Sequence, residues 1–184
     1  MAFRECRKLK TFELNKDIQE LGWLCMWKSG IERLDLPPHI RMTPERLGLC
    51  QTDPKVLRLP EGLEEVGEHW FANSDIERLV VPSSVKVLGA YAFNCCSHLR
   101  EVVFNPGSCL ETIGDECFFF CAFTRVTIPR SVRDIRMRAF LNCRKLAFVC
   151  FEEGSQLSHV GRWAFSGTRA KTEIEYPNAV KDDG

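Results

Sequence analysis

The chain has 184 residues, of which 45% are hydrophobic, so its length favours one domain and its composition supplies a sizeable core. Its 25 basic and 25 acidic residues give a net charge of zero, which leaves no basic surplus for binding nucleic acid or a membrane surface. The sequence has no run of about 18 apolar residues and no apolar leader at its N-terminus, so neither a membrane-spanning helix nor a secretory signal is expected.

Short strands are predicted at regular intervals along the chain. Each is written apolar-x-x-apolar-x-apolar, and its second half alternates with the period of two that a half-buried strand requires. The clearest copies span residues 31–36, 76–81, 99–104, 123–128 and 146–151. Pro37, Pro82 and Pro129 directly follow three of these copies, and proline ends strand pairing because it has no amide hydrogen to donate.

A second apolar pair, a glycine and an Ala-Phe turn follow each strand. Residues 85–96 read "VKVLGAYAFNCC" and residues 132–143 read "VRDIRMRAFLNC". We expect Gly89 and its equivalents to form a sharp corner because glycine tolerates a positive φ. Arg136 stands at the same position of the second segment, so the conformation required there cannot be one that only glycine adopts.

The Ala-Phe turn sets the register of an internal repeat. Its anchor position falls on Phe3, Met26, Gly48, Phe71, Phe93, Phe118, Phe140 and Phe165, which gives about eight units of 22–25 residues. The unit at residues 40–50 is degenerate, and the longest units carry extra residues in the turn sequences 105–108 and 152–155. One such unit cannot bury its own apolar positions, whereas stacked units cover one another. The repeat therefore predicts a β-rich solenoid whose parallel strands lie about 4.8 Å apart.

Residues 76–104, "IERLVVPSSVKVLGAYAFNCCSHLREVVF", resemble the BspA-like class of leucine-rich repeats. Units of that class read roughly L-x-x-I-x-I-P-x-x-V-x-x-I-G-x-x-A-F-x-x-C, and the resemblance extends from residue 2 to residue 177. It implies a curved, right-handed leucine-rich-repeat solenoid with a parallel sheet on its concave face. Residues 1–184 would form one such domain or a piece of a longer chain. The resemblance also implies protein recognition, because many members are surface-associated proteins linked to adhesion.

Ten cysteines are present, and Cys6, Cys96, Cys121 and Cys143 each stand three residues after an anchor. Other units have serine or threonine there, so the position favours a small side chain in a packed turn over a metal or disulfide ladder. No histidine lies at the usual spacing for a zinc site near Cys117 and Cys121. Without paired C-x-x-C motifs or a leader, we expect reduced thiols and no bound metal.

Motifs of catalysis and nucleotide binding do not occur in the sequence. The patterns G-x-S-x-G, G-x-G-x-x-G, Walker A and H-E-x-x-H are all missing, so we expect no catalytic residue, no cofactor and no enzyme activity. Phe119 and Phe120 fall outside the repeat register and are candidates for an exposed apolar patch.

The outward side of the long strands is the candidate partner-binding surface. Alternate strand residues face opposite ways, so two columns point outward if the apolar repeat positions point inward. We expect Arg78, Glu101 and Arg125 to alternate in sign across neighbouring strands, which would stabilise the sheet even without a partner. Arginine and aromatic residues are also enriched in interface hot spots. The candidate partner-binding residues are Arg33, Arg58, Arg78, Val80, Glu101, Val103, Arg125, Thr127, Phe148 and Cys150.

The leading hypothesis is a non-enzymatic module that recognises a protein partner, with no nucleic acid bound and no membrane span. The family resemblance favours a cell-surface adhesion or antigen protein. The absence of a leader and the many thiols favour a cytoplasmic scaffold or adaptor. Two other classes remain open: the repeat arm of a larger enzyme such as a kinase, and a small thiol or metal protein.

Overall fold

The computed structural model describes residues 55–170, 174–177 and 181–183, and shorter stretches before residue 55. These stretches are residues 3, 5–13, 15, 17–21, 29–30, 33–35 and 41–42. Strand residues before 55, apart from Glu13, and those of the last strand are described by their backbone pairing alone. The degenerate unit at residues 40–50 lies almost entirely outside the described residues.

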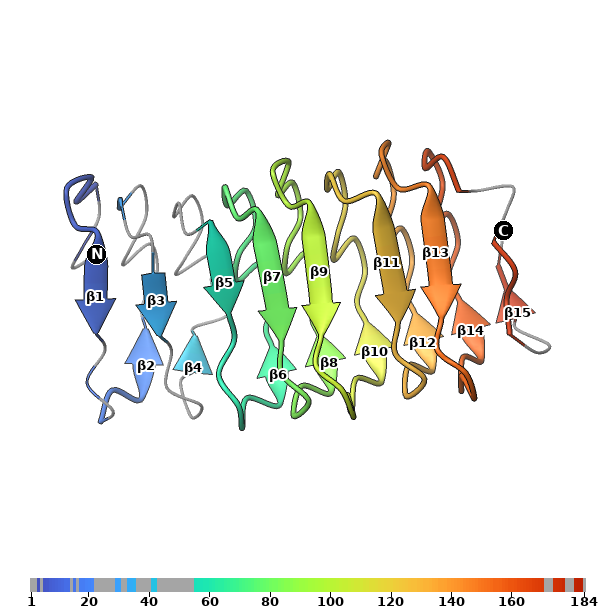
Figure 1. Cartoon of the computed structure of the whole chain (residues 1–184), viewed down its shortest axis with the longest axis horizontal. Helices are drawn as coiled ribbons and strands as arrows, with labels where there is room; N and C mark the ends of the chain where they lie inside the picture. Colours follow the sequence, from blue (N-terminus) through green and yellow to red (C-terminus); the bar gives the residue numbers. More distant parts are fainter. Residues whose placement is uncertain are drawn as a thin grey trace.

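Two rows of parallel strands and no helix make up this described part of the chain (Figure 1). The long strands are β1 (Thr11–Glu13), β3 (Arg33–Asp35), β5 (Val56–Arg58), β7 (Arg78–Val81), β9 (Glu101–Phe104), β11 (Arg125–Ile128) and β13 (Phe148–Phe151). The short strands are β2 (Glu20–Leu21), β4 (Arg41–Met42), β6 (Glu65–Val66), β8 (Val87–Leu88), β10 (Thr112–Ile113), β12 (Asp134–Ile135), β14 (His159–Val160) and β15 (Lys181–Asp182). Each coil contributes one strand to each row, so the chain forms the solenoid that the repeat predicts.

Strand register follows the predicted columns wherever long strands pair. Arg78 pairs with Glu101 between β7 and β9, and Arg125 pairs with Phe148 between β11 and β13. The burial pattern of β11 alternates from exposed to buried, with Val126 and Ile128 inside the coil. The inward and outward assignments made from the repeat are therefore confirmed for these strands.

The anchor phenylalanines form a continuous stack through the core. Phe71, Phe93, Phe118, Phe140 and Phe165 are all buried. Successive ring centroids lie 5.0–5.5 Å apart, with the ring planes within 17° of parallel. The spacing is close to that of adjacent strands, so each coil places one ring on the ring of the previous coil.

The corner glycines are needed for space rather than for a positive φ. A Cβ on Gly114 would lie 2.6 Å from the carbonyl carbon of Gly89 in the previous coil, and one on Gly161 would lie 2.5 Å from the amide nitrogen of Met137. Neither glycine has a positive φ, and neither has Arg136 at the equivalent position. The sequence-based explanation by a positive φ is therefore wrong for Gly114 and Gly161, where the close approach of the previous coil's backbone leaves little room for a Cβ.

Positive φ values occur instead on both sides of each anchor. The residues two positions before the anchors are His69, Tyr91, Glu116, Arg138 and Trp163, with φ of 48–59°. The residues two positions after them are Asn73, Cys95, Phe120, Asn142 and Gly167, with φ of 57–70°. Nine of these ten residues carry side chains, and the repeated turn projects them from the surface of the coil.

The cysteine column supplies hydrogen-bond donors to the neighbouring coil. The thiol of Cys96 donates to the carbonyl oxygen of Phe71 at 3.2 Å, and the thiol of Cys143 donates to that of Phe118 at 2.9 Å. Cys121 donates in the same way to Phe93 at 3.4 Å, and burial raises its pKa well above the usual range. A small side chain alone does not explain these three cysteines, because each also donates a hydrogen bond to a buried carbonyl of the neighbouring coil.

The row of long strands is interrupted between β9 and β11. Six short strands from β6 to β15 form one continuous sheet, whereas no backbone pairing joins β9 to β11. The inward residues Val102 and Phe104 of β9 are consequently half-buried, whereas their counterparts Leu79 and Val81 are buried. The longer turn 105–108 follows β9 directly, so the extra residues stand where the sheet is interrupted. The expectation of an uninterrupted sheet is wrong at this point.

His159 connects the last short strands through two side-chain hydrogen bonds. Its Nδ1 lies 2.8 Å from a carboxylate oxygen of Asp134, and its Nε2 lies 2.9 Å from one of Asp183 beside β15. The hydrogen bond with Asp134, followed by the one with Asp183, raises the pKa of His159 above its ordinary value. The Nε of Arg136 lies 2.6 Å from the second carboxylate oxygen of Asp134 and forms an ion pair with it.

We expect this contact to make stability depend on pH. A raised pKa in the folded state means that the stabilisation is complete below about pH 6.5 and is lost as the pH rises through the folded-state value. Because the site is near the surface, the contribution should be about 1 kcal/mol or less. Urea unfolding of the wild type and His159→Gln at pH 5.5 and 8.5 measures it. The wild-type advantage should shrink at the higher pH, and an equal advantage at both values would contradict this assignment.

Candidate protein-recognition surface

The long-strand face carries the residues that the sequence singles out for partner binding. Its described members with exposed side chains are Arg58, Glu101, Arg125, Thr127, Phe148 and Cys150, and Arg78, Val80 and Val103 are half-buried there. The backbone of Arg33 pairs with Thr11 in β1, but its side chain lies outside the described residues. The sequence thus places nine described side chains on one face of the molecule, and their role in binding stays a prediction.

Charge alternation along this face is only partly as expected. The Nε of Arg78 lies 3.1 Å from a carboxylate oxygen of Glu101, in an ion pair that is about half exposed. Arg125 does not continue the series toward Glu101, because β9 and β11 do not pair. Its guanidinium carbon lies 5.1 Å from the ring centroid of Phe148 instead. The predicted three-residue alternation is therefore corrected to one ion pair and one cation–π contact.

A recess of about 440 Å³ opens where β9 and β11 separate. Its lining comprises Arg100, Glu101, Val102, Val103, Phe104, Thr124, Arg125, Thr127 and Glu152. Four of these residues belong to the predicted surface. The recess combines an apolar floor, formed by half-buried residues of β9, with charged groups of both signs at its edge. Such a mixture is typical of sites that orient a ligand through a few polar contacts.

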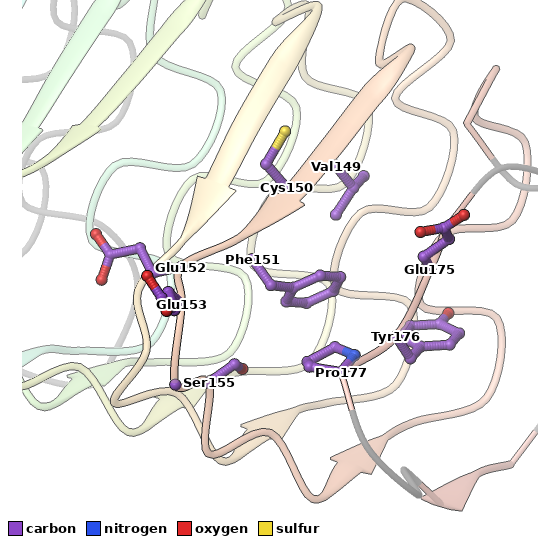
Figure 2. Close-up of a pocket in the computed structure, with 10 residues that line it drawn as sticks. Val149, Cys150, Phe151, Glu152, Glu153, Ser155, Glu175, Tyr176 and Pro177 are labelled. Atoms are coloured by element: carbon purple, nitrogen blue, oxygen red, sulfur yellow. The ribbon is translucent and has the colours of Figure 1, made fainter.

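A second recess of about 630 Å³ lies beyond β13 (Figure 2). Phe151 and Tyr176 form part of it, with ring centroids 6.1 Å apart. In Figure 2 the side chains of Glu152 and Glu153 lie on one side of the Phe151 ring, and Glu175 and Tyr176 lie on the other. Both recesses adjoin a strand that precedes a long turn, 105–108 or 152–155. The sequence revealed these turns by their length but not the openings beside them.

The described residues show no group of three side chains suited to bind a metal ion. A helix that could cross a bilayer is likewise not found in the part of the chain that the structure describes. Phe120, one of the two phenylalanines outside the register, is 42% exposed, and Phe119 is half-buried. The guanidinium carbon of Arg144 lies 5.7 Å from the Phe120 ring centroid. Neither Phe120 nor Arg144 belongs to a long strand.

The repeat pattern, the parallel solenoid and the anchor turns define a leucine-rich repeat protein. The chain belongs to the BspA type leucine rich repeat family, whose model matches residues 1–100, 50–147 and 111–183 in six copies. Eight anchor positions occur in the sequence, so two units depart from the family pattern. No relative was found among curated proteins.

The solved structures that resemble the chain include two bacterial proteins. The pneumococcal vaccine antigen PcpA is 26% identical, with a TM-score of 0.55 over 65% of this chain and 30% of that one. A leucine rich cell surface protein from Faecalibacterium prausnitzii A2-165 is 16% identical, with a TM-score of 0.58 over 97% of this chain and 55% of that one. The second likeness concerns the fold alone. The chain thus spans about a third and about half of the length of these two proteins.

Proposed function

We propose that the protein is a non-enzymatic recognition module, formed by residues 1–184 as one domain, that binds a protein partner through its long-strand face. The observation that carries the proposal is the contact between Arg125 and Phe148 beside the first recess. Phe148 is 53% exposed, the largest exposure among the described large hydrophobic side chains. An exposed aromatic ring held under a guanidinium group is a residue combination that interface hot spots favour.

The same face offers the varied chemistry that protein recognition requires. Val80 and Val103 form a half-buried apolar strip beside the ion pair of Arg78 and Glu101. An apolar centre with charged neighbours is the usual arrangement of a protein interface. Repeat proteins use their extended faces in this way because stacking presents equivalent positions side by side. The likeness to a pneumococcal vaccine antigen supports a recognition protein of the antigen type.

The test compares two pairs of substitutions of the same kind. Arg125→Ala with Phe148→Ala removes the cation–π pair from the long-strand face, and Arg144→Ala with Phe120→Ala removes the equivalent pair from an anchor turn. Partner retained by each immobilised variant is quantified by mass spectrometry after exposure to extract of the native cells. The first pair should reduce retention about tenfold or more, as the loss of a hot spot does. Equal retention by both variants would refute the choice of face.

A further inference from the structure

Charge is segregated along the solenoid, although the chain as a whole is neutral. Residues 61–116 contain ten acidic and three basic residues, a net charge of −7. Residues 117–170 contain nine basic and three acidic residues, a net charge of +6. All of these positions lie in the described part of the chain. The coils that carry β6, β8 and β10 are therefore acidic, and the coils that carry β12 and β14 are basic.

The segregation is clear on the face of the short strands. Equivalent six-residue segments there begin one position before a short strand and end two positions before an anchor. Segments 64–69, 86–91 and 111–116 together contain six acidic residues and one lysine. Segments 133–138 and 158–163 contain four arginines and one aspartate. The sign of the charge therefore reverses between β10 and β12 (Figure 1).

Exposed apolar side chains coincide with the basic end of this face. Met137 is 40% exposed and Trp163 is 43% exposed, whereas residues 61–116 contribute none of the large exposed hydrophobics. The guanidinium carbons of Arg138 and Arg162 lie 4.9 and 5.4 Å from the Trp163 ring. We call the surface formed by Arg133, Arg136, Met137, Arg138, Arg162 and Trp163 the basic corner.

Part of the positive charge of the basic corner is available to a ligand. Arg136 is paired with Asp134, and Arg138 lies 3.2 Å from Glu116. Arg133 and Arg162 form no ion pair with any described residue, and both are exposed. Trp163 therefore contacts one arginine that forms an ion pair and one that forms none with the described residues. Arginine, methionine and tryptophan are the residue types that interfaces enrich, and here all three are exposed together.

We propose that the basic corner binds an acidic segment of a partner protein, whose carboxylates contact Arg133 and Arg162 and whose apolar side chains cover Trp163 and Met137. Charge complementarity selects the acidic partner. A nucleic acid fits less well, because the positive surface spans only two coils, about 10 Å at the spacing of parallel strands. A phosphate backbone running further would meet the acidic segment 111–116. This surface is separate from the long-strand face, so the two proposals stand or fall independently.

Two labelled peptides test the proposal by fluorescence anisotropy. In the acidic peptide, pairs of glutamates alternate with single leucine or tryptophan residues, and in the matched peptide lysine replaces every glutamate. The acidic peptide should bind, and its affinity should fall severalfold when sodium chloride rises from about 50 to about 300 mM. Trp163→Ala and Arg162→Glu should each weaken binding about tenfold or more. Arg144→Glu makes the same charge change outside the basic corner and should leave binding within about twofold.

Several results would overturn the proposal. One is equal weakening by Arg144→Glu and Arg162→Glu, because the attraction would then be a property of overall charge. Equal affinity for the lysine peptide, or no binding of the acidic peptide, would do so as well. Tighter binding of a single-stranded oligonucleotide than of the acidic peptide would identify the surface as a nucleic-acid site instead. Circular dichroism of each variant establishes that the coils remain folded during these measurements.

Discussion

Phe140→Ala is expected to lower the free energy of unfolding by about 3–5 kcal/mol, the usual cost of truncating a buried phenylalanine. Phe140 is fully buried and stacks on Phe118 and Phe165, and its ring also meets Phe123 edge-on at 6.2 Å. The cavity would lie between three coils, and stacked repeats depend on their neighbours for stability. The loss should therefore spread to the adjacent coils rather than stay local.

Phe120→Ala is the matched control for this change. It removes the same atoms from a residue two positions after an anchor, but that side chain is 42% exposed. Its cost should stay within about 0.5 kcal/mol, as for most surface substitutions. Chemical denaturation followed by circular dichroism measures both variants. Similar losses for Phe120→Ala and Phe140→Ala would mean that the anchor stack does not determine stability.

Gly114→Ala is the second substitution with a large expected effect, even though it adds only one methyl group. The new Cβ would lie 2.6–2.8 Å from backbone atoms of Gly89, Ala90 and Leu88, which cannot move without separating two coils. We expect a loss of about 3 kcal/mol or more, at the upper end of the range for overpacking.

Gly107→Ala separates the two reasons for which a glycine is required. Gly107 has φ of 74°, and a Cβ added to it would have no atom within 4 Å, so only backbone strain opposes the substitution. That strain should cost about 1–2 kcal/mol. Thermal unfolding of both variants compares the effects. If Gly107→Ala proves the more damaging change, backbone conformation matters more for stability than the space between coils, which is the opposite of what we expect.

Much of the fold could be predicted from the sequence because every repeat unit has the same pattern of apolar and polar positions. Each unit independently indicates which residues point inward, and the anchor at Phe93 predicts the burial of Phe118 and Phe140. The outward position of Phe148 follows from the same register. Interactions between coils are harder to foresee. The role of Cys143 depends on the carbonyl oxygen of Phe118, which is distant in sequence and becomes a neighbour only after stacking.

The candidate site was predictable as a set of outward residues but not in its geometry. Turn 105–108 is visible in the sequence as added length, whereas the separation of β9 from β11 depends on how that length displaces the next coil. Arg125 consequently contacts Phe148 rather than Glu101. The charge reversal between residues 116 and 117 is present in the sequence, but the two charged halves cancel in the net charge of the whole chain, which is zero.

Photo-crosslinking on the long-strand face tests the central claim most directly. A photoreactive phenylalanine analogue is placed at position 148 in one variant and at position 120 in another, and both are irradiated in the native cells. Recognition through the long-strand face predicts a covalent adduct with a partner protein from position 148 and none from position 120. An adduct from position 120 alone, or from neither position, would contradict it.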